Sequence, residues 1–165
     1  MRTSWLSDHG GAIYKVDGAG AKKLVALDGA IAVVALAQTG DGAVWAATMP
    51  GAKPWRIDVA AGKASPGPAL SADKPKDVET IWSLAAVGNT LYAGTGPKGK
   101  LFAISGGGAK LAFDSEDKRI TAMTVTADGN VWFGTSERAL VFRFDPKTGK
   151  ARAMADFAGN EVSAL

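Results

Sequence analysis

The feature that most constrains the fold is an internal repeat. Four segments share an apolar pair with an aromatic residue, a break rich in Gly or Pro, a second strand with an aromatic residue, and a polar turn ending in Lys. These segments are SWLSDHGGAIYKVDGAGAK (4–22), VWAATMPGAKPWRIDVAAGK (44–63), LYAGTGPKGKLFAISGGGAK (91–110) and VWFGTSERALVFRFDPKTGK (131–150). Repeats of 20–50 residues indicate a chain built by stacking one supersecondary unit on the next.

Three positions keep their register through all four copies. The first aromatic residues are Trp5, Trp45, Tyr92 and Trp132, separated by 40, 47 and 40 residues. The second aromatic residues are Tyr14, Trp55, Phe102 and Phe142, and the closing lysines are Lys22, Lys63, Lys110 and Lys150. Because the first aromatic recurs at one place in every unit, we expect it to fill the wedge between neighbouring units rather than to bind sugars or cations.

A different strand precedes these segments. It occurs in VVALAQTGDGAV (33–44), IWSLAAVGNTL (81–91) and ITAMTVTADGNV (120–131), and each copy ends in Asp-Gly or Gly-Asn. These dipeptides are strong signals for a β-hairpin. A short fourth strand follows at KLVAL (23–27), KLAFD (110–114) and RAMADF (152–157). Each unit therefore has four strands.

Four-stranded units at a period of about 40 residues are typical of β-propeller blades. The sequence predicts an all-β, four-bladed propeller or half-propeller over residues 1–165, with no helix longer than a turn or two, because no segment carries a helical apolar stripe. Strands are expected near 32–37, 43–48, 53–58, 80–86, 90–94, 100–105, 120–126, 130–135 and 140–145.

The repeat is cut between the first and second strands of a blade. The chain opens on TSWLS (3–7), a second strand, and closes on EVSAL (161–165), which resembles a first strand. EVSAL can complete the first blade within one chain, or across a homodimer that forms an eight-bladed ring. We favour the homodimer, because four blades is the low end for closed rings. Trp82 is also bulky for an inner strand on which other units have Ala35, Ala122 or Ala164.

The charges and apolar residues exclude several classes of partner. The chain has 19 Lys and Arg against 16 Asp and Glu, and both signs occur on both loop edges of the expected propeller, so nucleic-acid binding is not expected. No apolar run reaches the ~20 residues that span a bilayer. The start, MRTSWLSDHGG, lacks the apolar region of a signal peptide. With no cysteine, disulfides and thiolate nucleophiles are excluded.

The stretch DGNVWFGTSERALVFRFDPKTGK (128–150) resembles the propeller repeats of bacterial two-component-regulator sensor domains. It is also similar, more distantly, to repeats of streptogramin-lyase and quinoprotein propellers. The lyase resemblance implies histidines and a carboxylate around a metal, but this chain has one histidine, His9. The quinoprotein resemblance implies cofactor-docking residues, and none is identified here. The resemblance therefore implies the fold and not a catalytic activity.

Three motifs could carry chemistry, and each is better interpreted as a loop. Gly94, Gly96 and Gly99 match G-x-G-x-x-G, but apolar strands flank them on both sides, whereas a phosphate site needs a following helix. Asp8 could orient His9 for general-base work or metal binding, yet no second histidine or cysteine joins them. The acidic run 114–117 could hold calcium, but its spacing matches no known loop and basic residues follow it at once.

These observations favour a non-catalytic module that recognises a ligand or protein through the loops joining second and third strands, because recognition commonly lies on loops of a rigid scaffold. The candidate binding residues are Asp8, His9, Lys53, Trp82, Lys98 and Arg138. No catalytic residue, metal ligand or cofactor is predicted. Two alternatives stay open: a lyase or hydrolase with a site at the channel mouth, and a propeller segment whose property is self-assembly.

Overall fold

The computed structural model describes residues 4–8, 10–71 and 75–165, and within these ranges the chain is almost entirely β-strand and turn. The single described helix is the 3-10 turn η1 (Pro75–Asp77), so no described helix is long and apolar enough to cross a membrane. The all-β prediction is confirmed.

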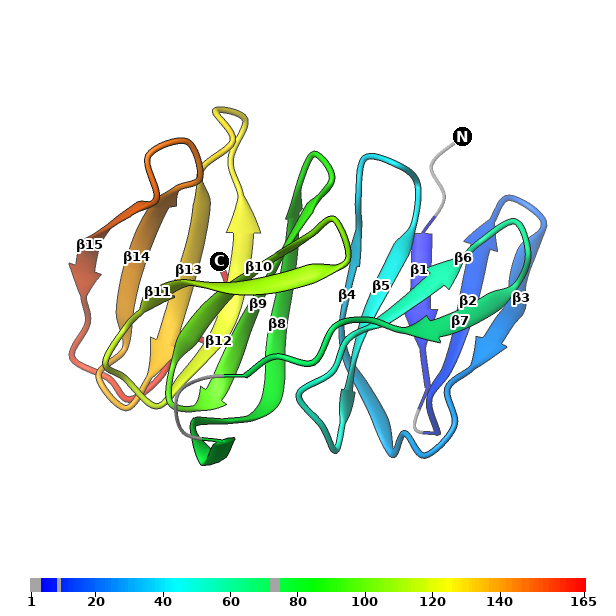
Figure 1. The fold of residues 1–165 in the computed structure, drawn as a ribbon, viewed down its shortest axis with the longest axis horizontal. Coiled ribbons are helices and arrows are strands. Elements are labelled where there is room, and N and C mark those ends of the chain that lie inside the picture. The colour runs from blue at the N-terminus through cyan, green and yellow to red at the C-terminus, as the bar shows by residue number, and fades with distance from the viewer. Residues whose placement is uncertain (1–3, 9, 72–74) are drawn as a thin grey trace.

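The strands form four antiparallel sheets that lie side by side (Figure 1). The first sheet contains β1 (Ser4–Ser7), β2 (Ala12–Asp17) and β3 (Gly20–Ala26). The second contains β4 (Ala32–Gln38), β5 (Val44–Met49), β6 (Trp55–Asp58) and β7 (Lys63–Pro66). The third contains β8 (Val78–Val87), β9 (Thr90–Pro97), β10 (Lys100–Ser105) and β11 (Gly108–Asp114). The fourth contains β12 (Arg119–Val125), β13 (Val131–Ser136), β14 (Leu140–Asp145) and β15 (Lys150–Asp156).

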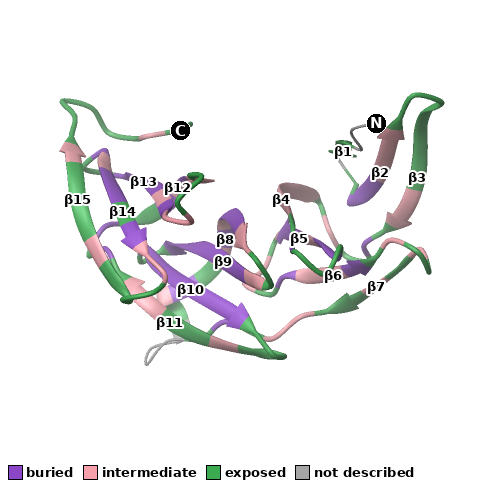
Figure 2. Ribbon diagram, turned by 90° about the horizontal axis from the view of Figure 1, so that it is seen from above, coloured by how far each residue is buried: buried purple, intermediate pink, exposed green. Residues whose placement is uncertain are grey.

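Within each sheet the strands pair in chain order, as in a propeller blade. Seen from above, the sheets form an open arc (Figure 2). Strands β4, β8 and β12 line its inner side, and β7, β11 and β15 lie toward its outer side. The first sheet has three strands because no described strand pairs with the free edge of β1. The described chain is therefore an arc of blades and not a closed ring.

The predicted hairpin turns form where the glycines allow them. Gly42, Gly88 and Gly129 follow the inner strands with φ of +84°, +56° and +82°, a region that glycine enters without steric penalty. In two of these turns a threonine hydroxyl donates a hydrogen bond of 2.5 Å to an aspartate carboxylate. Thr39 donates to Asp41, and Thr126 donates to Asp128. Turn chemistry therefore fixes the register of each inner hairpin.

The apolar core consists of one cluster at each boundary between neighbouring sheets. Ile13, Leu27, Val44 and Ile57 join the first sheet to the second. The second boundary is built around Phe102 and Ile104 together with Ala47, Ile81 and Leu91. The third boundary contains Leu101, Ile120, Phe133, Phe142 and Phe144. Each sheet thus buries both of its faces where it has a neighbour on each side.

The inner strands share a bulge that corrects one expectation. The pairing register shifts at Val34 in β4, at Trp82 in β8 and at Thr121 in β12. Trp82 therefore corresponds to Val34 and Thr121, and not to the alanines at 35 and 122, whose structural equivalent is Ser83. A bulge leaves one residue unpaired and turns its side chain away from the ladder, so a bulky residue is accommodated at this position.

Candidate functional site

The predicted loop residues occupy one edge of the arc, the lower edge in Figure 1, with one equivalent loop from each sheet. Asp8 lies between β1 and β2, Lys53 between β5 and β6, Lys98 between β9 and β10, and Arg138 between β13 and β14. His9 falls outside the described residues. The structure places these residues on a common edge but does not gather them around one cleft.

The Asp8 side chain forms hydrogen bonds within and beside its own loop. Its carboxylate accepts the backbone N–H of Ala12 at 2.9 Å and the hydroxyl of Tyr14 at 3.0 Å. The Ala12 hydrogen bond, followed by that of Tyr14, lowers the pKa of Asp8 below its ordinary value. The aspartate therefore shapes the β1–β2 turn.

Lys53 and Lys98 differ from Asp8, because their side chains are exposed and take part in no ion pair among the described residues. Among the described residues Lys98 forms hydrogen bonds through its backbone: its N–H donates to the carbonyl of Asp77 at 3.3 Å, and its carbonyl accepts the N–H of Lys100 at 2.7 Å. These two cations are available for a partner.

Arg138 joins the fourth sheet to the loop after the third. One guanidinium nitrogen donates to the carbonyls of Ser115 and Glu116 at 3.4 and 3.2 Å, and Nε lies 3.9 Å from Asp117 Oδ2. The Asp117 side chain is fully buried and accepts the Thr135 hydroxyl at 2.6 Å. These contacts hold the acidic loop after the third sheet against the fourth sheet. The described residues contain no group of three or more His, Asp or Glu that could hold a metal ion.

Trp82 packs beside the next inner strand. The guanidinium carbon of Arg119 lies 5.1 Å from the indole centroid, which is within cation–π range. Gly96 makes this approach possible, because a Cβ there would lie 2.8 Å from Trp82 Nε1 and 2.9 Å from Arg119. Gly94 and Gly96 lie within β9 and not in the turn expected from the sequence, and both allow close packing against neighbouring strands.

The repeated aromatic residues pack between sheets to different extents. Tyr92 is 5% exposed and its ring centroid lies 5.7 Å from that of Phe144 on the next sheet. Trp45 is half-buried against the apolar cluster at the second boundary, and Trp5 is half-buried against the cluster at the first boundary. Trp132 is also half-buried, although it belongs to the last sheet of the arc. Packing between blades is therefore observed for Tyr92, Trp45 and Trp5.

The C-terminal segment Glu161–Leu165 lies where the inner strand of a further blade would lie. Thr121 Oγ1 donates to the carbonyl of Val162 at 2.8 Å, and Ser83 Oγ, which is one position further along its own inner strand, donates to the carbonyl of Ile120 at 2.8 Å. A Cβ on Gly134 would lie 2.5 Å from Val162, and one on Gly94 would lie 2.5 Å from Ile120. Val162 is therefore the structural equivalent of Ile120.

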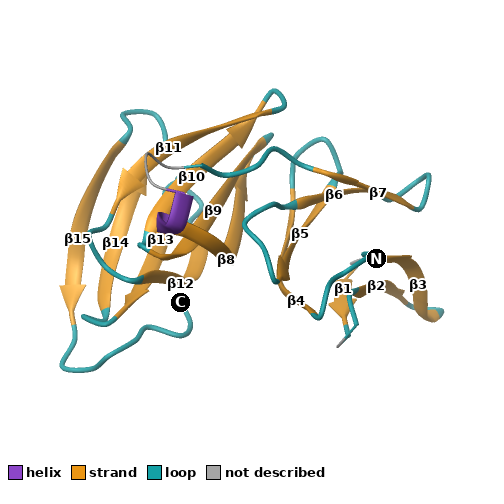
Figure 3. Cartoon of the chain, turned by 60° about the horizontal axis from the view of Figure 1, so that its bottom comes forward, coloured by secondary structure: helices purple, strands orange, loops and turns teal. Residues whose placement is uncertain are grey.

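This segment has no second strand to pair with among the described residues. Its single bridge joins Glu161 to Ser136, and Val162 N–H donates to the carbonyl of Thr135 at 3.1 Å. Leu165 is 50% exposed. At the other end of the arc, β1 pairs only with β2, and Leu6 is 55% exposed (Figure 3). The arc thus has an inner segment without a sheet at one end and a sheet without an inner strand at the other.

Comparison with known proteins supports the resemblance drawn from the sequence. Residues 114–137 match the family described as two component regulator propeller, so the chain carries a repeat of that kind. No curated protein sequence matches the chain.

Several solved structures share the fold. Virginiamycin B lyase from Staphylococcus aureus is 18% identical, with a TM-score of 0.74 over 91% of this chain and 50% of its own. The extracellular domain of the one-component system BT4673 from B. thetaiotaomicron is 16% identical, with a TM-score of 0.72 over 98% of this chain and 23% of its own. The computationally designed Ika8 protein is 19% identical, with a TM-score of 0.71 over 100% of this chain and 49% of its own. This chain therefore spans at most about half the length of these three propellers.

Proposed function

We propose that this chain is an assembly module that completes a larger propeller ring by pairing head to tail with a second copy of itself. Each copy supplies Glu161–Leu165 as the inner strand of the other's first sheet. The observation that carries this proposal is the position of Val162, which lies against Gly134 as Ile120 lies against the equivalent Gly94. Its carbonyl, like that of Ile120, accepts a side-chain hydroxyl from the preceding inner strand. The segment is thus held in an inner-strand position without a partner strand, and β1 lacks the neighbour it would provide.

The repeat sets the register of this junction. In the fourth sheet Ala122 pairs with Gly134 and Met123 with Phe133. Alignment of Trp132 with Trp5 makes Ser7 and Leu6 the equivalents of Gly134 and Phe133, and Val162 is equivalent to Ile120. Ala164 should therefore pair with Ser7, and Leu165 with Leu6. This pairing would place two exposed leucines against each other, which favours association by removing apolar surface from water.

Two copies would give a ring of eight blades, at the upper end of the common range of 4–8. Head-to-tail contacts between identical chains form a ring when their rotation closes. The open arc in Figure 2 favours this arrangement over a four-bladed ring, in which Glu161–Leu165 would have to reach β1 of its own chain. Closure would also remove two strand edges that otherwise invite aggregation.

Within such a ring, the edge formed by the second-to-third-strand loops would be the recognition surface. The exposed side chains of Lys53 and Lys98 support this role, because neither is committed to an ion pair in the described residues. Asp8 and Arg138 would hold the loops in shape. A ring would present every one of these groups twice, so a partner with two acidic contacts could bind both copies at once.

The junction can be tested with cysteines, because the chain has none of its own. In the Leu6→Cys, Leu165→Cys double variant, mild oxidation should produce a covalent dimer, since cross-strand Cβ atoms lie about 4.5–5.5 Å apart. A matched variant with Ser4→Cys in place of Leu6→Cys is out of register and should cross-link poorly. A covalent monomer would show that the ring closes within one chain. Equal yields for the two variants would refute the register.

A further inference from the structure

The boundary between the first and second sheets contains a cleft of about 520 Å³ that the sequence did not indicate. Its lining comes from β2, β3 and the turn between β6 and β7, and comprises Lys15, Asp17, Lys22, Lys23, Leu24 and residues 59–62. A volume of this size is within the range of small-molecule sites, about 300–1,000 Å³. Three lysines and one aspartate give the cleft a positive charge.

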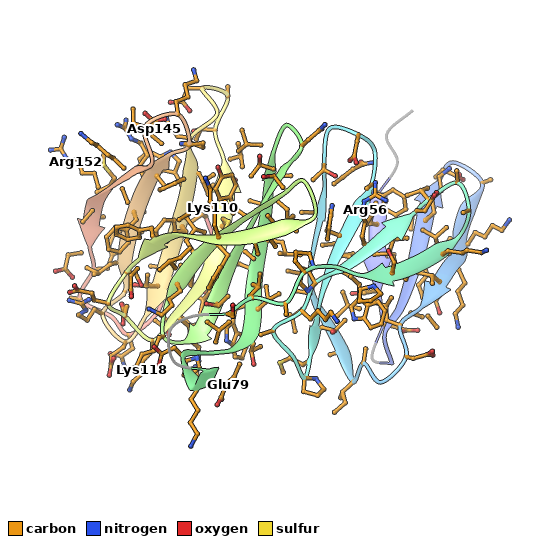
Figure 4. All side chains as sticks on the ribbon, viewed as in Figure 1. Arg56, Glu79, Lys110, Lys118, Asp145 and Arg152 are labelled. Carbon is orange, nitrogen blue, oxygen red and sulfur yellow. The ribbon has the colours of Figure 1, made fainter. Side chains whose placement is uncertain are left out.

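Two of these lysines face each other directly. Lys15 on β2 and Lys22 on β3 are partners in the antiparallel ladder. Like charges at such positions destabilise a sheet, because the Cβ atoms are only about 4.5–5.5 Å apart. At the same ladder position the second sheet pairs Arg56 with Ser65, and the third pairs Ala103 with Lys110. Figure 4 shows Arg56 and Lys110 on those sheets.

The carboxylates around the cleft do not neutralise the lysines. Asp17 accepts the backbone N–H of Ala19 at 3.0 Å, and Asp58 accepts the backbone N–H groups of Ala60 and Ala61 at 3.0 and 2.9 Å. Asp41 forms an ion pair with Arg56 at 3.0 Å. Among the described residues, Lys15, Lys22 and Lys23 have no carboxylate within ion-pair distance.

The fourth sheet repeats the like-charged pair but not the cleft. Arg143 on β14 and Arg152 on β15 face each other at the corresponding ladder position. Arg152 lies at the outer end of the arc (Figure 4), where no described sheet covers this face. The first boundary differs because the second sheet supplies the opposite wall, with Val59 and the turn that follows it. Of these two like-charged ladder pairs, the pair in the first sheet therefore lines a walled cleft.

We propose that this cleft binds a small anion with at least two negative groups and a short apolar portion. The negative groups would bridge Lys15 and Lys22 and relieve their repulsion. The side chains of Leu24 and Val59, which are half-buried in the first boundary cluster, would contact the apolar portion. The site lies within one chain, so it is independent of ring assembly.

Inorganic pyrophosphate and citrate are suitable probes, because they share multiple charges but differ in their acidic groups. Calorimetric titration at low salt should show saturable binding of at least one probe to the wild-type chain, and binding should weaken as salt is added. In Lys15→Gln, Lys22→Gln the affinity should fall at least tenfold. The matched control Lys110→Gln removes a lysine at the same ladder position of the third sheet and should change the affinity less than twofold.

A second variant guards against misfolding. Lys22→Glu converts the repulsive pair into an attractive one, so its Tm without ligand should exceed that of the wild-type chain, and added pyrophosphate or citrate should no longer raise it. A response to one probe only would identify the acidic group preferred by the cleft and would support the site. The proposal is wrong if neither probe binds the wild-type chain, or if Lys110→Gln loses as much affinity as the double variant.

Discussion

The boundary between the third and fourth sheets and the boundary between the first and second sheets use the same ladder differently. At the third–fourth boundary, Phe113 lies 6.0 and 5.4 Å from the ring centroids of Phe133 and Phe142, which stack on each other at 5.2 Å. At the loop edge of this boundary, Asp117 accepts the Thr135 hydroxyl and lies near the Arg138 guanidinium. At the first–second boundary the buried cluster is largely aliphatic, and the outer side opens into the basic cleft.

This difference shows which part of the repeat is structural and which part is free to vary. The strands, turns and inner bulges recur in the two halves, apart from the inner strand that the first sheet lacks. The side chains at equivalent ladder positions differ more. Aromatic rings and a buried carboxylate fill the boundary between the third and fourth sheets. Lysines line a cleft at the boundary between the first and second sheets. Binding properties of this arc therefore depend on side chains placed on a common frame.

The largest effect should come from emptying the aromatic wedge. Phe133→Ala should lower the free energy of unfolding by about 3–5 kcal/mol, because its ring is fully buried. Leu6→Ala is the equivalent change in the first sheet and should cost about 0.5 kcal/mol or less at concentrations that keep chains separate, since Leu6 is exposed. Urea denaturation measures both. Similar losses for the two variants would contradict the difference in burial between these two equivalent positions.

Gly94 in β9 and Gly134 in β13, which lie on the second strands of their sheets, should give the next largest effect. Gly94→Ala should destabilise the fold by about 1–3 kcal/mol, because the new Cβ would lie 2.5 Å from Ile120 in a packed core. Gly134→Ala would place its Cβ equally close to Val162, but that segment ends the arc. We expect this variant to displace the segment and weaken dimerisation while the remaining blades keep their stability. Thermal melting and sedimentation distinguish the two outcomes, and wild-type assembly of Gly134→Ala would contradict the role of Val162.

The hydrogen bond between Thr135 and Asp117 should contribute less to the free energy of unfolding than the aromatic residues at the same boundary. Thr135→Val removes the hydroxyl that donates to the buried Asp117 carboxylate, and should cost about 1–3 kcal/mol. Thr39→Val serves as the comparison in the second sheet, because Thr39 bonds the exposed carboxylate of Asp41. Its loss should be smaller, since water can replace that hydroxyl. Chemical denaturation of the pair tests this order, and a larger loss for Thr39→Val would reverse it.

The smallest expected effect is the loss of folding stability at acidic pH that comes from two turn aspartates. Hydrogen bonds from the Thr39 and Arg56 side chains lower the pKa of Asp41 from 3.8 to about 2, and those from Thr126 and Asn130 lower the pKa of Asp128 to about 2. The folded state prefers both carboxylates ionised, so this stabilisation is present above the ordinary pKa and is lost as the pH falls toward 2. Only Asp41 has an arginine partner, so added salt should raise its pKa more than that of Asp128. NMR titration at two salt concentrations measures this, and equal shifts would contradict it.

Much of the fold follows from local signals in the sequence. The strands expected at 100–105 and 140–145 coincide with β10 and β14, because aromatic alternation and flanking turns define both ends. The segment EVSAL forms only one bridge, since strand structure requires a partner and the described chain offers none. The place of Trp82 was misassigned by one residue because a bulge changes the count along the strand.

The candidate sites could be predicted only in part. The common loop edge follows from strand alternation, but the engagement of Arg138 with backbone carbonyls depends on how two blades approach each other. The basic cleft was missed because charges were balanced over a whole edge. Its signal was present locally: counting outward from the turn after Asp17 pairs Lys15 with Lys22. The wall opposite those lysines could not be inferred, since it belongs to another repeat.

The mass of the assembly in solution tests the central claim most directly. Light scattering after size-exclusion chromatography should give about 34 kDa, twice the 16.9 kDa of one chain. A chain lacking residues 161–165 should lose that species, because β1 would then have no donated strand. A sharp wild-type peak at the mass of one chain, unchanged over a wide concentration range, would contradict the head-to-tail ring.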